Sequence, residues 1–97
     1  MDFLNELFGI IEDRRQHAKP EESYVAKMKA AGLSRIAQKV GEEAVETVIA
    51  AMAKDNEGLK YESADLLFHL MMLWAEAGLT PKMISEELEK RHGATKS

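Results

Sequence analysis

The sequence has no cysteine among its 97 residues, which excludes both a disulfide framework and a thiolate metal site. Patterns typical of β-strands are scarce, because no run alternates polar and apolar residues and no Asn-Gly or Asp-Gly pair marks a hairpin turn. The N-terminus has neither a basic leader nor a long apolar stretch, so we expect no signal peptide and no membrane span. These absences predict a cytoplasmic, helical protein.

Basic residues are also few and dispersed. The 13 Lys and Arg residues face 17 Asp and Glu residues, which gives a formal net charge of −4. Proteins that bind nucleic acids gather their basic residues into a patch, so we expect no nucleic-acid partner. A chain of this length fits one domain with a modest core. We therefore expect a single all-α domain over residues 1–92 and a flexible tail at 93–97.

Apolar residues recur at helical spacing in several segments, which predicts an antiparallel bundle of about five helices. The expected helices are about 2–17, a short helix with Pro20 in its first turn and Gly32 as its stop, 34–54, 59–77, and a last helix from Pro81 to Arg91 with Thr80 as its N-cap. The turn expected at residues 55–58 is short, so the helices on either side should pack antiparallel.

The third and fourth expected helices distribute their apolar residues differently. The third has an apolar stripe of Ile36, Val40, Ala44, Val48 and Met52, with Lys39, Glu43 and Glu46 on another face. The fourth is apolar nearly all round over residues 66–75. A helix that is apolar on every side must be covered on every side, and so short a chain has little material for this. We therefore predict a homodimer that completes the bundle.

Two acidic clusters lie on consecutive helices. Glu43 and Glu46 are three residues apart, as are Glu62 and Asp65, so each pair shares a helix face. If the helices pack side by side, four carboxylates converge with no cation among them, which is stable only with protons or a bound metal. Oxygen ligands favour a hard divalent cation. The alternative is that these acids are solvated, because glutamate is a common helix former.

Several residues near these acids have two interpretations. His69 lies one turn after Asp65 and is either a core histidine bonded to that aspartate or a residue that orients it beside a metal. Lys39 lies one turn before the first acidic cluster. It is either a surface lysine or a contact for a substrate phosphate next to the metal. Lys27 and Arg35 are weaker candidates for the same phosphate contact.

Four blocks of the sequence carry a family resemblance. They are Ser23-Tyr24-Val25-Ala26-Lys27, Gly32-Leu33, residues 39–51 and residues 62–70. The Glu-Glu-x-x-Glu and Glu-x-x-Asp elements resemble those of all-α nucleoside triphosphate pyrophosphohydrolases, including MazG-like enzymes. The Ser-Tyr-x-x-Lys and Lys-x-Gly-Glu-Glu-Ala elements are more specific and resemble the phosphoribosyl-ATP pyrophosphohydrolase family of histidine biosynthesis.

This resemblance implies hydrolysis of phosphoribosyl-ATP to phosphoribosyl-AMP and pyrophosphate by a metal-activated water at the α–β phosphoanhydride. The implied cofactor is Mg²⁺, for which Mn²⁺ can substitute. Carried over by motif, the metal ligands are Glu43, Glu46, Glu62 and Asp65. By the same resemblance, Glu42 would help with a second ion or position the water. The chemistry also needs a carboxylate that accepts the proton of this water, and the candidates for this catalytic role are Glu46 and Glu42. Two other functions remain open: a housekeeping pyrophosphohydrolase of non-standard nucleotides, and a non-catalytic helical interaction module.

Overall fold

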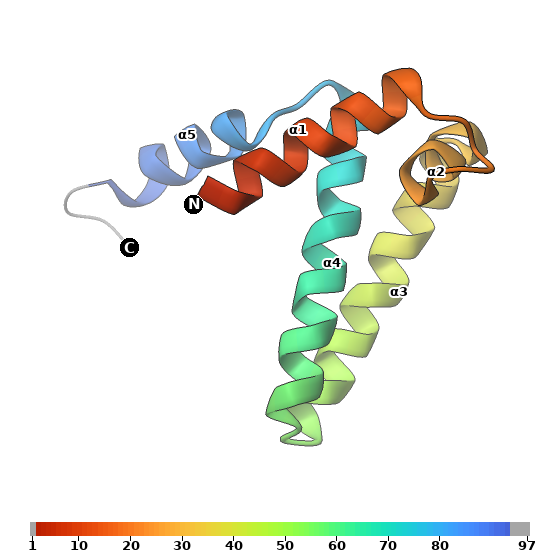
Figure 1. The fold of residues 1–97 in the computed structure, drawn as a ribbon. Helices are drawn as coiled ribbons and strands as arrows, with labels where there is room; N and C mark the ends of the chain where they lie inside the picture. Colours follow the sequence, from red (N-terminus) through yellow and green to blue (C-terminus); the bar gives the residue numbers. More distant parts are fainter. Residues whose placement is uncertain (1, 94–97) are drawn as a thin grey trace.

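The computed structural model describes residues 2–93 and has five α-helices and no strand in that range, which confirms the all-α prediction (Figure 1). The helices are α1 (Asp2–His17), α2 (Tyr24–Ala31), α3 (Leu33–Met52), α4 (Asn56–Ala77) and α5 (Pro81–His92). Residues 94–97 of the predicted tail lie outside the described residues. Within residues 2–93, no helix has the length and apolar character needed to cross a membrane.

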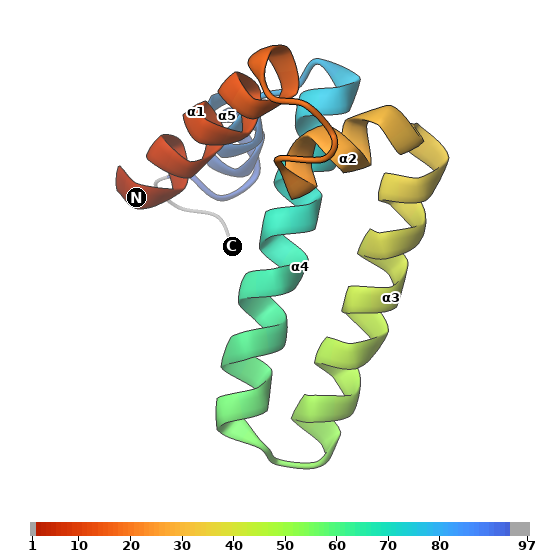
Figure 2. The same ribbon diagram turned by 45° about the vertical axis from the view of Figure 1, so that its right-hand side comes forward.

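Helices α3 and α4 form a long antiparallel hairpin, as the short connection between them predicted (Figure 1). Helices α1 and α5 lie across one end of this hairpin, and α2 lies beside the start of α3 at the same end. The other half of the hairpin projects away from α1, α2 and α5 in both views (Figure 2).

Helix α2 starts later than the sequence predicted. The prediction that Pro20 opens this helix was wrong, because Pro20 lies in a turn before it. The N–H groups of Glu22 and Ser23 donate to the Lys19 carbonyl oxygen at 2.9 and 3.2 Å, which closes that turn. Ser23 is the N-cap, and its Oγ accepts a hydrogen bond from the Ala26 N–H at 3.2 Å. The capping serine therefore sets the start of the helix.

The α3–α4 connection is also shorter than predicted. Helix α4 begins at Asn56 rather than near Leu59, because Asp55 is its N-cap and accepts a hydrogen bond from the Gly58 N–H at 3.0 Å. The chain reverses just before this cap, where Lys54 has a φ of 57°. The expected turn at residues 55–58 is therefore mostly the first turn of α4.

The remaining helix ends follow the predictions to within two residues, the largest difference being the end of α3 at Met52 rather than at Lys54. Thr80 is the N-cap of α5 and accepts a hydrogen bond from the Met83 N–H at 3.2 Å, with Pro81 as the first helical residue. Gly32 and Gly78 end α2 and α4 with φ angles of 99° and 83°. These positive angles suit glycine, because it has no Cβ.

The apolar core lies where α1 and α2 meet the hairpin. Its buried residues are Phe8, Ile11, Val25, Met28, Ile36, Met71, Met72 and Ala75. They come from α1, α2, the first part of α3 and the last part of α4. In the projecting half of the hairpin, Ala50 is the only buried apolar residue of those described. That half has almost no apolar core of its own.

The predicted apolar stripe of α3 is divided between core and surface. Ile36 is buried, but Val48 and Met52 are exposed, because α3 turns the face that contains Glu43 toward α4. Residues on the opposite side of α3 are exposed to solvent in the single chain. We call four of them the α3 stripe: Val45, Val48, Ile49 and Met52, which are 59, 59, 60 and 78% exposed.

A charged pair joins α1 to α4. Arg15 Nη1 lies 2.6 Å from Glu76 Oε1, with side chains only 15% and 27% exposed. We expect Glu76→Ala to lower the free energy of unfolding by about 1–2 kcal/mol, because a charged hydrogen bond away from water is lost. Urea unfolding measures this. As a control, Glu57→Ala breaks the exposed Lys60–Glu57 pair and should cost less than about 0.5 kcal/mol. An equal loss in the free energy of unfolding for Glu76→Ala and Glu57→Ala would contradict the prediction.

Candidate active site

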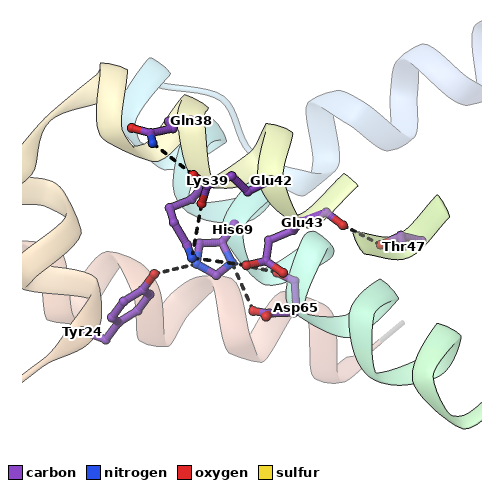
Figure 3. Close-up of polar contacts among 8 residues, drawn as sticks. All are labelled: Tyr24, Gln38, Lys39, Glu42, Glu43, Thr47, Asp65 and His69. Atoms are coloured by element: carbon purple, nitrogen blue, oxygen red, sulfur yellow. Dashed lines mark hydrogen bonds and ion pairs between the residues drawn. The ribbon is translucent and has the colours of Figure 1, made fainter. Parts of the chain in front are cut away.

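The α3–α4 hairpin brings the predicted acidic residues together. Single ligand atoms of Glu43, Glu46 and Glu62 lie within 4.8 Å of one another. A second group with the same spacing contains Glu43, Asp65 and His69, and Figure 3 shows the Glu43 and Asp65 side chains facing each other. Glu43 is only 4% exposed and belongs to both groups. It is therefore the centre of the acidic cluster.

Two carboxylate oxygens of this cluster are buried and unpaired. Glu43 Oε1 and Glu62 Oε1 have no hydrogen-bond partner in the part of the chain that the structure describes. A buried acceptor without a partner is costly, so such atoms call for a cation or a proton donor. A set of carboxylate oxygens suits Mg²⁺ or Mn²⁺. The residues present therefore fit a divalent cation.

One cation does lie among the acids, contrary to the expectation from the sequence. Lys39 Nζ is 3.3 Å from Glu43 Oε2 and 3.8 Å from Glu42 Oε1 (Figure 3). The hydrogen bond to Glu43 raises the pKa of Lys39 above its ordinary value. Because the ammonium contacts Oε2, the unpaired Oε1 of Glu43 remains available on the other side of the carboxylate.

The pKa values of Glu43 and Asp65 are shifted in opposite directions. Burial acts to raise the pKa of Glu43, but the neighbouring Asp65 carboxyl and the Lys39 ammonium outweigh this and lower that pKa below its ordinary value. Burial raises the pKa of Asp65, and the hydrogen bond and charge of Glu43 raise it further. In the absence of metal, the negative charge of the pair is therefore held on Glu43.

Glu62 should make the metal-free protein less stable as pH rises. Burial raises its pKa, and the nearby charges of Glu46, Glu43 and Asp65 add to this. Above its ordinary pKa, the folded protein keeps a proton that the unfolded chain releases, so folding stability falls until the folded pKa is passed. In EDTA at pH 7, we expect Glu62→Gln to melt at a higher temperature than wild type.

Circular dichroism melts at pH 4 and pH 7 check this expectation. The difference between Glu62→Gln and wild type should be smaller at pH 4, because both states then hold more of the Glu62 proton. Glu57→Gln, which changes an exposed acid of the same helix, should melt like wild type at both pH values. A Glu62→Gln protein that melts below wild type at pH 7 would contradict the prediction.

His69 is buried and both ring nitrogens have partners. Nδ1 lies 2.9 Å from the backbone oxygen of Asp65 and 3.2 Å from its Oδ1, so the expected contact between these residues is present. Nε2 lies 2.7 Å from the hydroxyl oxygen of Tyr24 (Figure 3). This contact between Tyr24 and His69 was not predicted from the sequence. Its only signal was the position of this tyrosine in the Ser-Tyr-x-x-Lys element.

The other predicted site residues lie around the edge of the cluster. Glu46 is exposed and faces Glu62, whereas exposed Glu42 accepts a hydrogen bond from Gln38 Nε2 at 3.0 Å and belongs to neither acidic group. Arg35 is exposed, and its charge acts on the hydroxyl of Tyr24. Lys27 is exposed, and over residues 2–93 no ion pair joins it to the acids.

The helical hairpin brings four carboxylates together, and two of their oxygens are buried and unpaired among the described residues. The chain is therefore one of the all-α proteins with a carboxylate cluster between two antiparallel helices. Comparison with known proteins is more specific. The family described as phosphoribosyl-ATP pyrophosphohydrolase matches residues 4–92, and the chain belongs to this family. The resemblance seen in the sequence is therefore confirmed.

Individual relatives agree with the family. A phosphoribosyl-ATP pyrophosphatase of Azospirillum brasilense is 51% identical over 92 residues, which are 95% of this chain and 82% of that protein. One of Rhizorhabdus wittichii is 54% identical over 92 residues, with 95% and 86% covered. The histidine biosynthesis bifunctional protein HisIE of Thermus thermophilus is 46% identical over 89 residues, which are 92% of this chain and 41% of that longer protein.

Proposed function

We propose that this protein hydrolyses phosphoribosyl-ATP to phosphoribosyl-AMP and pyrophosphate, the second step of histidine biosynthesis. Two observations support this activity: the chain belongs to the family, and relatives that share about half of their aligned residues with it are named for this activity. The structural observation that carries the proposal is the buried Glu43, shared by two groups of potential ligand atoms and left with one unpaired oxygen. The substrate is a small nucleotide, and the reaction is hydrolysis of a phosphoanhydride.

The four acids Glu43, Glu46, Glu62 and Asp65 would hold Mg²⁺, with Mn²⁺ as a substitute. Their oxygen atoms and the two unpaired buried oxygens support this assignment. When bound, the ion supplies neutralisation of phosphate charge and lowers the pKa of water. His69 would orient Asp65 through the contacts of its Nδ1 atom.

Glu46 is better placed than Glu42 to accept the proton of the attacking water. Both are exposed, so both are accessible to water and substrate. Glu46 lies in the acidic group with Glu43 and Glu62, whereas Glu42 is directed to Gln38 and to the lysine beside it. A general base must lie within hydrogen-bond reach of the water that it activates. This requirement favours Glu46.

Lys39 would bind the substrate phosphates beside the acids, with Arg35 and Lys27 as more distant contributors. Lys39 is 23% exposed in its side chain, so its ammonium is accessible while it contacts Glu43. We expect Lys39→Gln to raise KM for phosphoribosyl-ATP by about ten- to a hundredfold, because a charge-assisted hydrogen bond is lost. Steady-state kinetics measure this. Lys60→Gln, at an exposed position on α4, is the control, and an unchanged KM in Lys39→Gln would contradict the role.

Pyrophosphate release from phosphoribosyl-ATP, with and without EDTA, tests the proposal. We expect release that EDTA abolishes and that added Mg²⁺ or Mn²⁺ restores. A panel with dUTP and dCTP addresses the alternative enzyme: turnover of these nucleotides but not of phosphoribosyl-ATP would favour housekeeping pyrophosphohydrolysis. Calorimetry addresses the interaction module, which should bind neither cation.

We also propose that the chain forms a homodimer through the projecting half of the hairpin. The α3 stripe is exposed there. The apolar run at residues 66–75 of α4 lies nearer the core, where Met71, Met72 and Ala75 are buried and its other apolar residues are only partly buried. Neither α1, α2 nor α5 lies beside the projecting half (Figures 1 and 2). A second hairpin packed on it would complete a four-helix arrangement and remove the stripe from water.

We propose in addition that residues 1–92 form one domain, as the extent of the family match over residues 4–92 suggests. The cytoplasmic location and the flexible tail at 93–97 stay predictions of the sequence.

A further inference from the structure

Tyr24 is the only residue of α2 that contacts the acidic cluster through a hydrogen bond in the described chain. Its hydroxyl oxygen lies 2.7 Å from Nε2 of His69, as Figure 3 shows. The other ring nitrogen of His69 contacts the backbone and carboxylate oxygens of Asp65. A continuous chain of contacts therefore runs from α2 through His69 to one of the proposed cation ligands.

These contacts set the direction of each hydrogen bond. The backbone oxygen of Asp65 can only accept, so Nδ1 of His69 carries a proton and donates it. In the neutral ring Nε2 is then an acceptor, and the Tyr24 hydroxyl donates to it. Both nitrogens of His69 have partners, so in the second acidic group the carboxylates of Glu43 and Asp65 are what remain as potential cation ligands. The imidazole is held with its N–H directed at Asp65.

The ring of Tyr24 packs against the residues that place its hydroxyl beside His69. Tyr24 is the first residue of α2, directly after the Ser23 N-cap. Its ring stacks on Phe68 with centroids 6.2 Å apart and meets the His69 ring edge-on at 5.6 Å. Val25, the next residue, is 7% exposed and anchors α2 in the core. Tyr24 itself is 44% exposed, so one side of its ring faces solvent while the other contacts Phe68 and His69.

We propose that Tyr24 is a positioning residue of the cation site, which through His69 holds the Asp65 carboxylate in the orientation that faces Glu43. This inference rests on the proposed function, because it assumes that Asp65 is a cation ligand. Partners that orient a ligand in this way contribute to affinity without contacting the ion. Tyr24 thus couples the position of α2 to the α3–α4 site.

Tyr24→Phe tests this role, because it removes only the hydroxyl and keeps the stacked ring. Calorimetric titration of the purified protein with Mn²⁺ should show about tenfold weaker binding in this variant, with little change in melting temperature. Tyr61→Phe is the matched control, since Tyr61 is the other tyrosine of the chain and is 68% exposed. It should bind Mn²⁺ like wild type.

Two further measurements separate positioning from simple packing. Because Tyr24 acts through His69, adding Tyr24→Phe to His69→Gln should weaken Mn²⁺ binding no further. In the metal-free wild type, ¹⁵N NMR of the imidazole should show a protonated Nδ1 and an unprotonated Nε2. This spectrum requires no variant, so the test does not depend on whether His69→Gln folds.

The inference is overturned if Tyr24→Phe binds Mn²⁺ as tightly as wild type, or if the proton of His69 resides on Nε2. Equal losses in Tyr24→Phe and Tyr61→Phe would also overturn it. If the wild-type protein binds no Mn²⁺, both this inference and the proposed cation site are overturned. If wild type binds Mn²⁺ and Tyr24→Phe binds it equally tightly, only the role of Tyr24 is overturned.

Discussion

Glu43→Gln should lower the rate of pyrophosphate release from phosphoribosyl-ATP by about a thousandfold or more, because a bound cation contributes several kcal/mol to transition-state stabilisation. Glu43 is the residue for which this expectation is strongest. It is buried, it belongs to both groups of potential ligand atoms, and its Oε1 atom has no partner in the described chain. An amide of nearly the same shape removes the negative charge without emptying the position.

Three measurements check this result. Release is followed with and without EDTA, and Mg²⁺ binding is followed by calorimetry on the same preparations. Glu57→Gln is the control, since it changes an exposed acid on α4 that pairs only with Lys60 among the described residues. Glu43→Gln should retain its helical circular dichroism. A variant that keeps wild-type activity, or activity that survives EDTA, would contradict a cation mechanism.

Ile49→Asp should convert the proposed homodimer into a monomer. Ile49 is 60% exposed in the single chain and lies in the middle of the α3 stripe. In a dimer packed on this stripe, the new carboxylate would lose water without gaining a partner, which costs several kcal/mol and weakens association by roughly a thousandfold. Sedimentation at micromolar concentration should show a dimer for wild type and a monomer for the variant.

Leu33→Asp is the control for this prediction. Leu33 is also exposed, at 53%, and is on the same helix but outside the α3 stripe. An aspartate in the first turn of a helix is favourable, so the variant should fold and remain a dimer. A wild-type monomer, or dissociation in both variants, would show that the stripe does not form the contact.

Local sequence signals predicted most of the fold. The bounds of α1 and the Thr80 cap of α5 follow directly from residue patterns. The two errors, at Pro20 and at the start of α4, have a common cause. In both places a side chain, Ser23 or Asp55, caps the helix through one hydrogen bond and so fixes where the helix begins. Several polar residues nearby could have done the same.

The acidic cluster was predictable because helical spacing and a short connection are local features. Residues three apart share a face, and a tight turn makes consecutive helices antiparallel, so the four acids meet once these two faces turn toward each other, as they do in the structure. The pairing of Lys39 with Glu43 was not predicted, since a lysine one turn away can also extend into solvent. The contact between Tyr24 and His69 was not predictable, because 45 residues separate them.

The sequence by itself determined the helices, the antiparallel hairpin and the pairing of two carboxylates on one face of each of its helices, because each depends on residues within a few turns of one another. Only the tertiary structure decided which face of α3 meets α4. It thereby buried Glu43, left the α3 stripe exposed and brought α2 to His69. These outcomes depend on how whole helices pack around a shared core, and the rotation of a helix about its axis is set by all of its contacts together.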